Sequence, residues 1–125
     1  MLHHLSFAVA DLDRSARFYD AALAPLGYRR VWSDDTAVGY GTIDGQDKFA
    51  IRLRPDHHTV AGDGFHAAFS APSQEAVAAF YEAAMQHGGT DNGPPELCPE
   101  YGPGYYAAFV IDPDGYRIEA VIIRA

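Results

Sequence analysis

The chain has 125 residues, of which 48% are hydrophobic and 21% are charged, and this composition suits one compact domain with its own core rather than a disordered segment. The net charge of −8 disfavours nucleic acid and anionic membranes as partners, and no apolar run approaches the roughly 18 residues of a membrane-spanning helix. Cys98 is the single cysteine, so no intrachain disulfide can form, and with no visible secretory signal the expected location is cytoplasmic.

The first half of the chain begins with a strand and continues into a helix. Apolar residues at helical spacing predict this helix over residues 12–26, with Asp11 as its N-cap and Gly27 as its end. Turn signals then separate three further runs of strand-forming residues. The expected strands of this half are residues 2–10, 28–33, 36–43 and 48–54.

The second half repeats this order. The polar residues 57–63 predict a linker between a first module, residues 1–56, and a second module, residues 64–125. Ser73 is the expected N-cap of a helix over residues 74–87. The expected strands are residues 65–71, a weakly signalled one near 96–98 where prolines crowd the chain, 105–111 and 116–123.

The two halves also share residues at a constant spacing of 62 positions (66 − 4 = 62). The matched pairs are His4/His66, Phe7/Phe69, Phe18/Phe80, Tyr19/Tyr81, Ala22/Ala84 and Gly27/Gly89. Such unlike residue types at one spacing indicate an internal duplication. We therefore expect an α+β fold of two tandem βαβββ modules in one compact domain, with mixed sheets that form a cup and helices on its outer face.

Three side chains in this pattern could hold a metal ion. Strand alternation places His4 and His66 on the faces opposite the helices, and Glu119 interrupts an otherwise apolar strand, where an unpaired carboxylate would be costly to bury. Two imidazoles and one carboxylate suit divalent Fe, Mn, Ni, Co or Zn and leave positions open for substrate. Either histidine alone could instead be structural, and Glu119 could pair with Arg52 or Arg117 without any metal.

Two segments carry a resemblance to a known family. Residues 4–19 and 109–119 resemble the opening and closing motifs of the vicinal oxygen chelate superfamily, which includes glyoxalase I, bleomycin-resistance proteins, fosfomycin-resistance proteins and extradiol dioxygenases. The resemblance implies that His4, His66 and Glu119 are metal ligands. It also implies a small-molecule substrate that chelates the metal, in lyase, isomerase or dioxygenase chemistry.

One position departs from the glyoxalase I pattern, which usually has a glutamate ligand on the last strand of the first module. Matching residues 51–52 to residues 118–119 places Arg52 there, and a guanidinium cannot ligate a metal. Arg52 could instead orient an anionic substrate group or pair with Glu119. This departure favours a three-ligand site over a four-ligand isomerase site.

The sequence thus favours a metal-dependent enzyme in which Glu119 and Arg52 take part in catalysis. The alternative is a metal-free binding protein of the bleomycin-resistance type, suggested by the acidic charge and eight tyrosines, and a relative with a stable fold and no activity is a third possibility. Because each open sheet face must be covered, we expect a homodimer, with the cup formed within one chain or across two. Candidates for the pocket wall are Trp32, Tyr40, Tyr101, Tyr105 and Tyr106.

Overall fold

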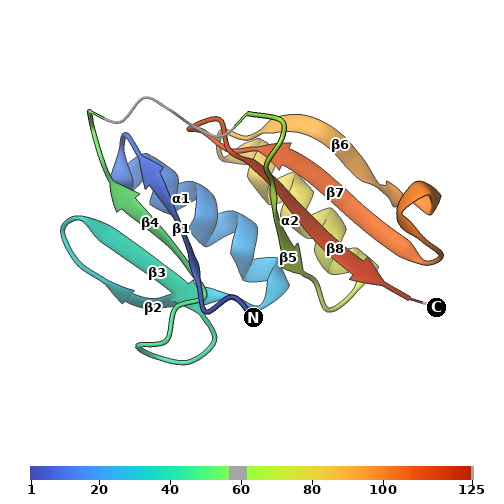
Figure 1. The fold of residues 1–125 in the computed structure, drawn as a ribbon, viewed down its shortest axis with the longest axis horizontal. Helices are drawn as coiled ribbons and strands as arrows, with labels where there is room; N and C mark the ends of the chain where they lie inside the picture. Colours follow the sequence, from blue (N-terminus) through green and yellow to red (C-terminus); the bar gives the residue numbers. More distant parts are fainter. Residues whose placement is uncertain (57–61, 125) are drawn as a thin grey trace.

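The computed structural model describes residues 1–56 and 62–124, and it contains two βαβββ modules side by side (Figure 1). The expected linker, residues 57–63, lies mostly outside the described residues. The first module consists of β1 (Leu5–Val9), α1 (Leu12–Leu23), β2 (Arg29–Ser33), β3 (Ala37–Gly41) and β4 (Phe49–Leu53). The second consists of β5 (Ala67–Ser70), α2 (Gln74–Gln86), β6 (Thr90–Leu97), β7 (Tyr105–Ile111) and β8 (Arg117–Ile123).

Each module forms a four-stranded mixed sheet with the same strand order. The order is β1-β4-β3-β2 in the first sheet and β5-β8-β7-β6 in the second. The first strand of each module pairs in parallel with the last, and the other pairs are antiparallel. The identical topology confirms the expected α+β fold with two βαβββ modules.

The first helix is shorter than its apolar pattern predicts. Asp11 caps it as expected, because its carboxylate accepts a hydrogen bond from the backbone N–H of Arg14 at 3.1 Å. The α-helix ends at Leu23, and a 3₁₀ turn with Pro25 near its start carries the chain to Gly27. Proline has no N–H to donate to the preceding helical turn, and Gly27 adopts a left-handed conformation with φ of 93° that ends the turn.

The weakly signalled strand of the second module is longer than expected. β6 spans Thr90–Leu97 despite Pro94 and Pro95. It is the edge strand of its sheet, where β7 is its one partner among the described strands, and its register shifts between Asp91 and Glu96. An edge strand with irregular register tolerates prolines because one row of its N–H groups has no partner strand.

Both modules contribute to a single hydrophobic core. The helices lie on the same side of the two sheets and pack against each other, behind the strands in Figure 1. Rings from the two modules meet in this core: Phe49 of β4 and Phe69 of β5 are perpendicular, with centroids 5.2 Å apart. The modules are therefore joined by packing as well as by chain connectivity.

The turn between β7 and β8 ties the second module to the first. Asp114 in this turn accepts hydrogen bonds from the Ala10 backbone N–H at 3.0 Å, the Arg14 guanidinium at 2.9 Å and the Ser15 hydroxyl at 2.7 Å. Nearby, the Tyr19 hydroxyl of α1 donates to the buried Asp112 at 2.5 Å. The junction of β1 with α1, the first turns of α1, and the β7–β8 turn of the other module thus form one polar contact.

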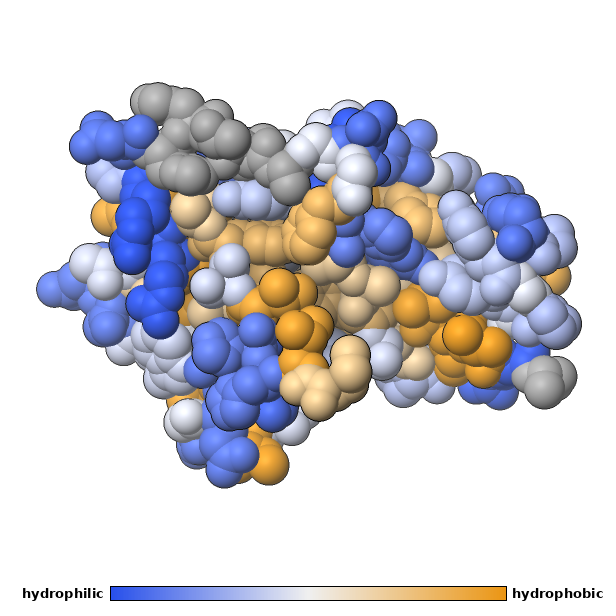
Figure 2. Space-filling model, in the orientation of Figure 1, coloured by the Kyte–Doolittle hydropathy of each residue, from blue (hydrophilic) through white to orange (hydrophobic). Residues whose placement is uncertain are grey.

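In the part of the chain that the structure describes, no helix covers the opposite face of either sheet. Figure 2 shows this side of the molecule, where apolar surface forms a band across the middle, over the neighbourhood of β1, β5 and β8, and hydrophilic surface lies toward the ends. We call these two sheet surfaces the open faces.

No helix within residues 1–56 and 62–124 is long and apolar enough to cross a membrane.

Candidate functional site

The most unusual buried group on the open faces is Glu119 in the middle of β8. Its neighbours Ile118 and Ala120 point to the helix side and are fully buried, so alternation turns Glu119 to the open face. The side chain is nevertheless only 1% exposed. A carboxylate removed from water in this way requires hydrogen-bond donors or a cation.

Two donors from adjacent strands meet this carboxylate. His66, just before β5, places Nε2 2.8 Å from Oε1, so this ring nitrogen donates to the carboxylate oxygen. The Tyr105 hydroxyl, from the start of β7, donates to Oε2. Burial and the adjacent Glu119 charge raise the pKa of Tyr105 above its usual value, so this hydroxyl stays protonated and remains a donor. The pairing with Arg52 or Arg117 that the sequence left open is not the contact that Glu119 makes.

The His66 ring borders an open pocket of about 410 Å³ on the second module. This volume lies within the roughly 300–1,000 Å³ of small-molecule sites. Its polar and aromatic lining includes Asp63, His66, Asn92, Tyr101, Phe109 and Arg117. The imidazole side chain is 55% exposed, so a ligand in the pocket can reach it.

Sequence reasoning did not place Arg117 or Phe109 in this pocket, although alternation could have done so. Arg117 precedes Glu119 by two residues on β8 and therefore shares its face. Phe109 is the direct partner of Glu119 across the β7–β8 ladder, and it follows Tyr105 by four residues on β7. An arginine beside an aromatic wall can bind an anionic group of a flat ligand.

The third expected ligand, His4, does not join this cluster in the structure. His4 is exposed before β1, and its Nδ1 atom lies 2.9 Å from Nδ1 of His3. Across residues 1–56 and 62–124, no three metal-ligating side chains of the same chain come together. His66 and Glu119 supply nitrogen and oxygen donors that suit a divalent transition ion, and such a site needs at least one further donor.

An aromatic side chain lies on the open face of the first module. Trp32 on β2 lies across Gly39 on β3, where a Cβ atom would stand 2.2 Å from the indole nitrogen. That nitrogen donates to the Asp47 carboxylate at 2.9 Å, and the Arg52 guanidinium lies 5.9 Å from the ring centroid. Arg52 thus points to the open side, as strand alternation predicts, and makes a cation–π contact.

The strand register corrects the expected equivalence of Arg52 and Glu119. Glu119 pairs with Ala68 on β5, whose equivalent at the 62-residue spacing is Ser6 on β1. Ser6 pairs with Ala50, whereas Arg52 pairs with Ala8 two residues further on. The match was wrong because the segments between helix and last strand differ in length. Ala50, which is fully buried, occupies the position equivalent to Glu119, and its methyl group cannot ligate a metal.

The five aromatic candidates divide between the two sides of the sheets. Tyr105 contacts Glu119, Tyr101 lines the His66 pocket, and Trp32 lies on the other open face. Tyr40 and Tyr106 instead lie on the helix side, within or against the core. Alternation explains this difference, since Tyr106 directly follows Tyr105 on β7.

Comparison with known proteins agrees with this architecture. The chain matches the Glyoxalase/Bleomycin resistance protein/Dioxygenase superfamily over residues 1–120. It is 27% identical over 128 residues to the protein YqjT of Bacillus subtilis (strain 168), and the match covers 96% of this chain and 97% of that protein.

Solved structures share the fold. A glyoxalase/bleomycin resistance protein from Albidiferax ferrireducens T118 superimposes with a TM-score of 0.80 at 30% identity, covering 94% of both chains. An E144Q mutant of glyoxalase I from Zea mays gives a TM-score of 0.69 at 20% identity, and the match covers 94% of this chain and 45% of that one. With the duplicated modules and the match over residues 1–120, the chain belongs to the Glyoxalase/Bleomycin resistance protein/Dioxygenase superfamily.

Proposed function

We propose that this protein is a divalent-metal-dependent enzyme acting on a small molecule, with His66 and Glu119 as two of the metal ligands. The observation that carries this proposal is the convergence of a half-exposed imidazole on a buried carboxylate beside an open pocket. A bound divalent ion would supply Lewis-acid stabilisation of negative charge on substrate oxygens. The metal could be Fe, Mn, Ni, Co or Zn.

The chain's own side chains have distinct roles in this proposal. Tyr105 holds Glu119 in place through Oε2, which leaves Oε1 and His66 Nε2 facing each other. Phe109 and Tyr101 provide an aromatic wall for the apolar part of the substrate, and Arg117 binds an anionic group on it. Arg52 is assigned no catalytic step because it lies on the other module's open face, over Trp32.

The third ligand requires a second chain in this proposal. His4 belongs to the first module, and its own chain does not bring it to His66 and Glu119. In a homodimer whose open faces cover each other, the first module of one protomer lies against the second module of its partner. His4 of one chain would then complete the site that His66 and Glu119 begin on the other.

A metal-free binding protein is the second candidate function. One observation favours it: both oxygens of Glu119 already accept hydrogen bonds from protein donors, so the carboxylate is satisfied without a cation. The chain's net charge of −8 and aromatic pocket wall would suit a cationic, flat ligand. This function predicts ligand binding that does not depend on metal.

Metal analysis of protein purified without a histidine tag or chelator tests the enzyme proposal. Wild type should carry a divalent transition ion, and His66→Ala and Glu119→Ala should each lose most of it while circular dichroism shows a retained fold. His87→Ala is the matched control, because the His87 ring is exposed and, among the described residues, its one hydrogen bond is to the Ala83 carbonyl, at 2.8 Å. Full metal content in Glu119→Ala would refute the site, and metal-free wild type that binds cationic aromatic compounds would favour the second function.

A further inference from the structure

The internal duplication allows each contact of one module to be compared with its counterpart in the other. Ala8 on β1 and Ser70 on β5 are equivalent at the 62-residue spacing. The carbonyl of each accepts a hydrogen bond from a tyrosine hydroxyl across the seam between the modules. Tyr116 donates to Ala8 at 2.8 Å, and Tyr28 donates to Ser70 at 3.1 Å. The two hydrogen bonds are thus counterparts.

The rings behind these hydroxyls are placed differently. The Tyr116 ring stacks on Phe7, with centroids 4.1 Å apart and planes within 15°, and Phe7 is only 3% exposed. Phe69, the counterpart of Phe7, remains partly exposed. Among the described residues, its one aromatic contact is the perpendicular Phe49 ring, so no ring covers its face.

Phe7 is covered and Phe69 is not because the two modules have different residues directly before their last strands. In the second module that residue is Tyr116, directly before β8. The strand register places Asp47 at the equivalent point before β4. The Asp47 carboxylate accepts a hydrogen bond from the Trp32 indole N–H on the open face. Tyr28 reaches Ser70 from a different element, the chain after the 3₁₀ turn, and does not stack on Phe69.

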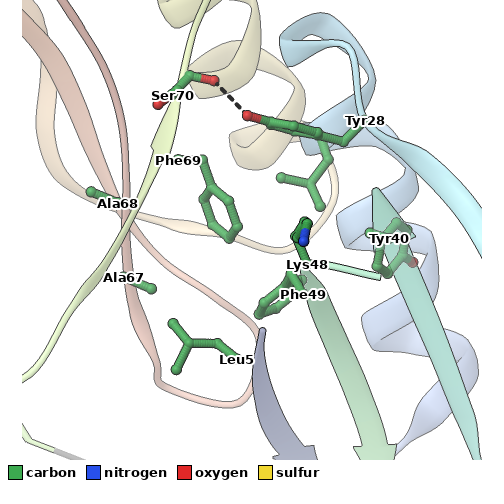
Figure 3. Close-up of a pocket in the computed structure, with 10 residues that line it drawn as sticks. Leu5, Tyr28, Tyr40, Lys48, Phe49, Ala67, Ala68, Phe69 and Ser70 are labelled. Carbon is green, nitrogen blue, oxygen red and sulfur yellow. Dashed lines mark hydrogen bonds between the residues drawn. The ribbon is translucent and has the colours of Figure 1, made fainter. Parts of the chain in front are cut away.

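A cavity of about 250 Å³ lies beside Phe69 and Ser70, the counterparts of the two residues, Phe7 and Ala8, that Tyr116 contacts in the other module (Figure 3). Figure 3 shows the Phe69 ring projecting from β5 toward Phe49 and Lys48, with Tyr28 across one end of the space. The apolar wall also includes Leu5, Leu23 and Ala67. A dry cavity of about 150 Å³ in another protein is large enough to hold benzene. This space therefore accommodates one ring with a short substituent, and it is smaller than a typical drug-sized site.

Lys48 gives this cavity a charge preference. Its side chain is exposed at the cavity, and among residues 1–56 and 62–124 no carboxylate lies within ion-pair distance of it. The rest of the wall is mainly apolar, with the Tyr28 hydroxyl engaged by Ser70. An anion is thus favoured at the rim and a flat apolar group inside.

The geometry points to a second ligand site in this seam cavity, for a monocyclic aromatic carboxylate whose ring stacks on Phe69 and whose carboxylate pairs with Lys48. The ring takes the place that Tyr116 occupies against Phe7 in the other module. The site is separate from the His66 pocket, with which it shares no lining residue, and it does not depend on the proposed enzymatic function.

Titration of ¹⁵N-labelled protein with phenylacetate, followed by NMR, tests this site. Saturable shifts should centre on the amides of Phe69, Ser70 and Lys48. Cyclohexylacetate, which keeps the carboxylate but lacks a flat ring, should bind more weakly. Lys48→Met should weaken phenylacetate about three- to fivefold, the size expected for an exposed ion pair, and leave neutral phenylacetamide unchanged.

Two further variants distinguish binding in the seam cavity from binding in the His66 pocket. Ala67→Leu introduces into the cavity the side chain found at the equivalent Leu5 position, and should abolish saturable binding of both phenyl compounds while thermal unfolding reports an intact fold. His66→Ala should bind phenylacetate as wild type does. The inference is overturned by an absence of saturable shifts, by shifts confined to His66, Phe109 and Arg117, or by equal affinity of wild type and Lys48→Met for phenylacetate.

Discussion

Asp112 is a buried carboxyl, 3% exposed, whose hydrogen bonds only partly replace water. It accepts from the Tyr19 hydroxyl at 2.5 Å and from the backbone N–H groups of Asp114 and Tyr116, each at 2.9 Å. Burial outweighs these bonds and raises its pKa from 3.8 to about 6. The folded state therefore binds this proton more tightly than the unfolded chain does.

The raised pKa predicts the direction of a pH dependence. The stabilisation from protonated Asp112 is fully present below pH 3.8 and is lost as pH rises through about 6. The shift corresponds to a contribution of about 3 kcal/mol to the free energy of unfolding. Asp112→Asn cannot ionise. As pH rises from below 3.8 to above about 6, its free energy of unfolding should therefore increase relative to that of wild type by about 3 kcal/mol, as measured by urea unfolding at each pH. A difference between the two proteins that stays constant with pH would contradict this assignment.

The hydroxyl that faces Asp112 makes a separate prediction. Tyr19→Phe removes the donor to Asp112 and leaves a buried carboxylate oxygen without that partner. We expect the free energy of unfolding to fall by about 1–3 kcal/mol near neutral pH. Tyr81→Phe is the matched control, because Tyr81 is the equivalent tyrosine of α2 and donates to Asp91 in an exposed hydrogen bond at 3.0 Å. A loss as large in the control would show that the buried contact is not special.

At the scale of elements, the β7–β8 turn of the second module joins the first module through three hydrogen bonds to Asp114. Asp114→Ala would remove the acceptor of three donors at the start of the first module, including the fully buried Ser15 hydroxyl. We expect a loss of about 2–4 kcal/mol in the free energy of unfolding.

An exposed aspartate provides the control for this turn. Asp44 is 84% exposed, and its ion pair with Arg29 at 2.6 Å lies on the surface, so Asp44→Ala should change stability by less than about 1 kcal/mol. If Asp114→Ala were equally mild in thermal and urea unfolding, the turn would not hold the modules together.

For the whole molecule, the expected assembly is a homodimer whose open faces cover each other. Ile123 lies on the open face of β8 and is 65% exposed, and Tyr101 above the pocket is 61% exposed. Light scattering at micromolar concentration should give twice the chain mass of 13.6 kDa. Ile123→Asp should shift the population to monomer because it would bury a charge in the interface.

Ile43 provides the comparison for this substitution. It is 57% exposed in the segment between β3 and β4, outside the strands that form the open faces of both modules, so Ile43→Asp adds the same charge and should remain dimeric. A wild-type mass of 13.6 kDa would reject the dimer, and with it the delivery of His4 from a second chain. A dimeric Ile123→Asp would place the interface elsewhere.

The candidate site was predictable in part. The 62-residue spacing and the polar interruption in β8 were sufficient to single out His66 and Glu119, because local alternation determines which face a side chain occupies. Their contact, its support by Tyr105, and the separation of His4 depend on neighbouring strands that are distant in sequence. The expected equivalence of Arg52 with Glu119 was wrong because matching short motifs does not determine strand register when the intervening segments differ in length.

The sequence by itself determined the two βαβββ modules, the family and the capping residues Asp11 and Ser73, since these follow from periodicity, duplication and short-range hydrogen bonding. Only the tertiary structure decided that both modules share one core and that Ala50 takes the position equivalent to Glu119. It also revealed that the Phe69 ring is left partly uncovered. Such features depend on how two similar halves pack against each other, and small differences in loop length and side-chain size break their symmetry in ways that a linear pattern does not record.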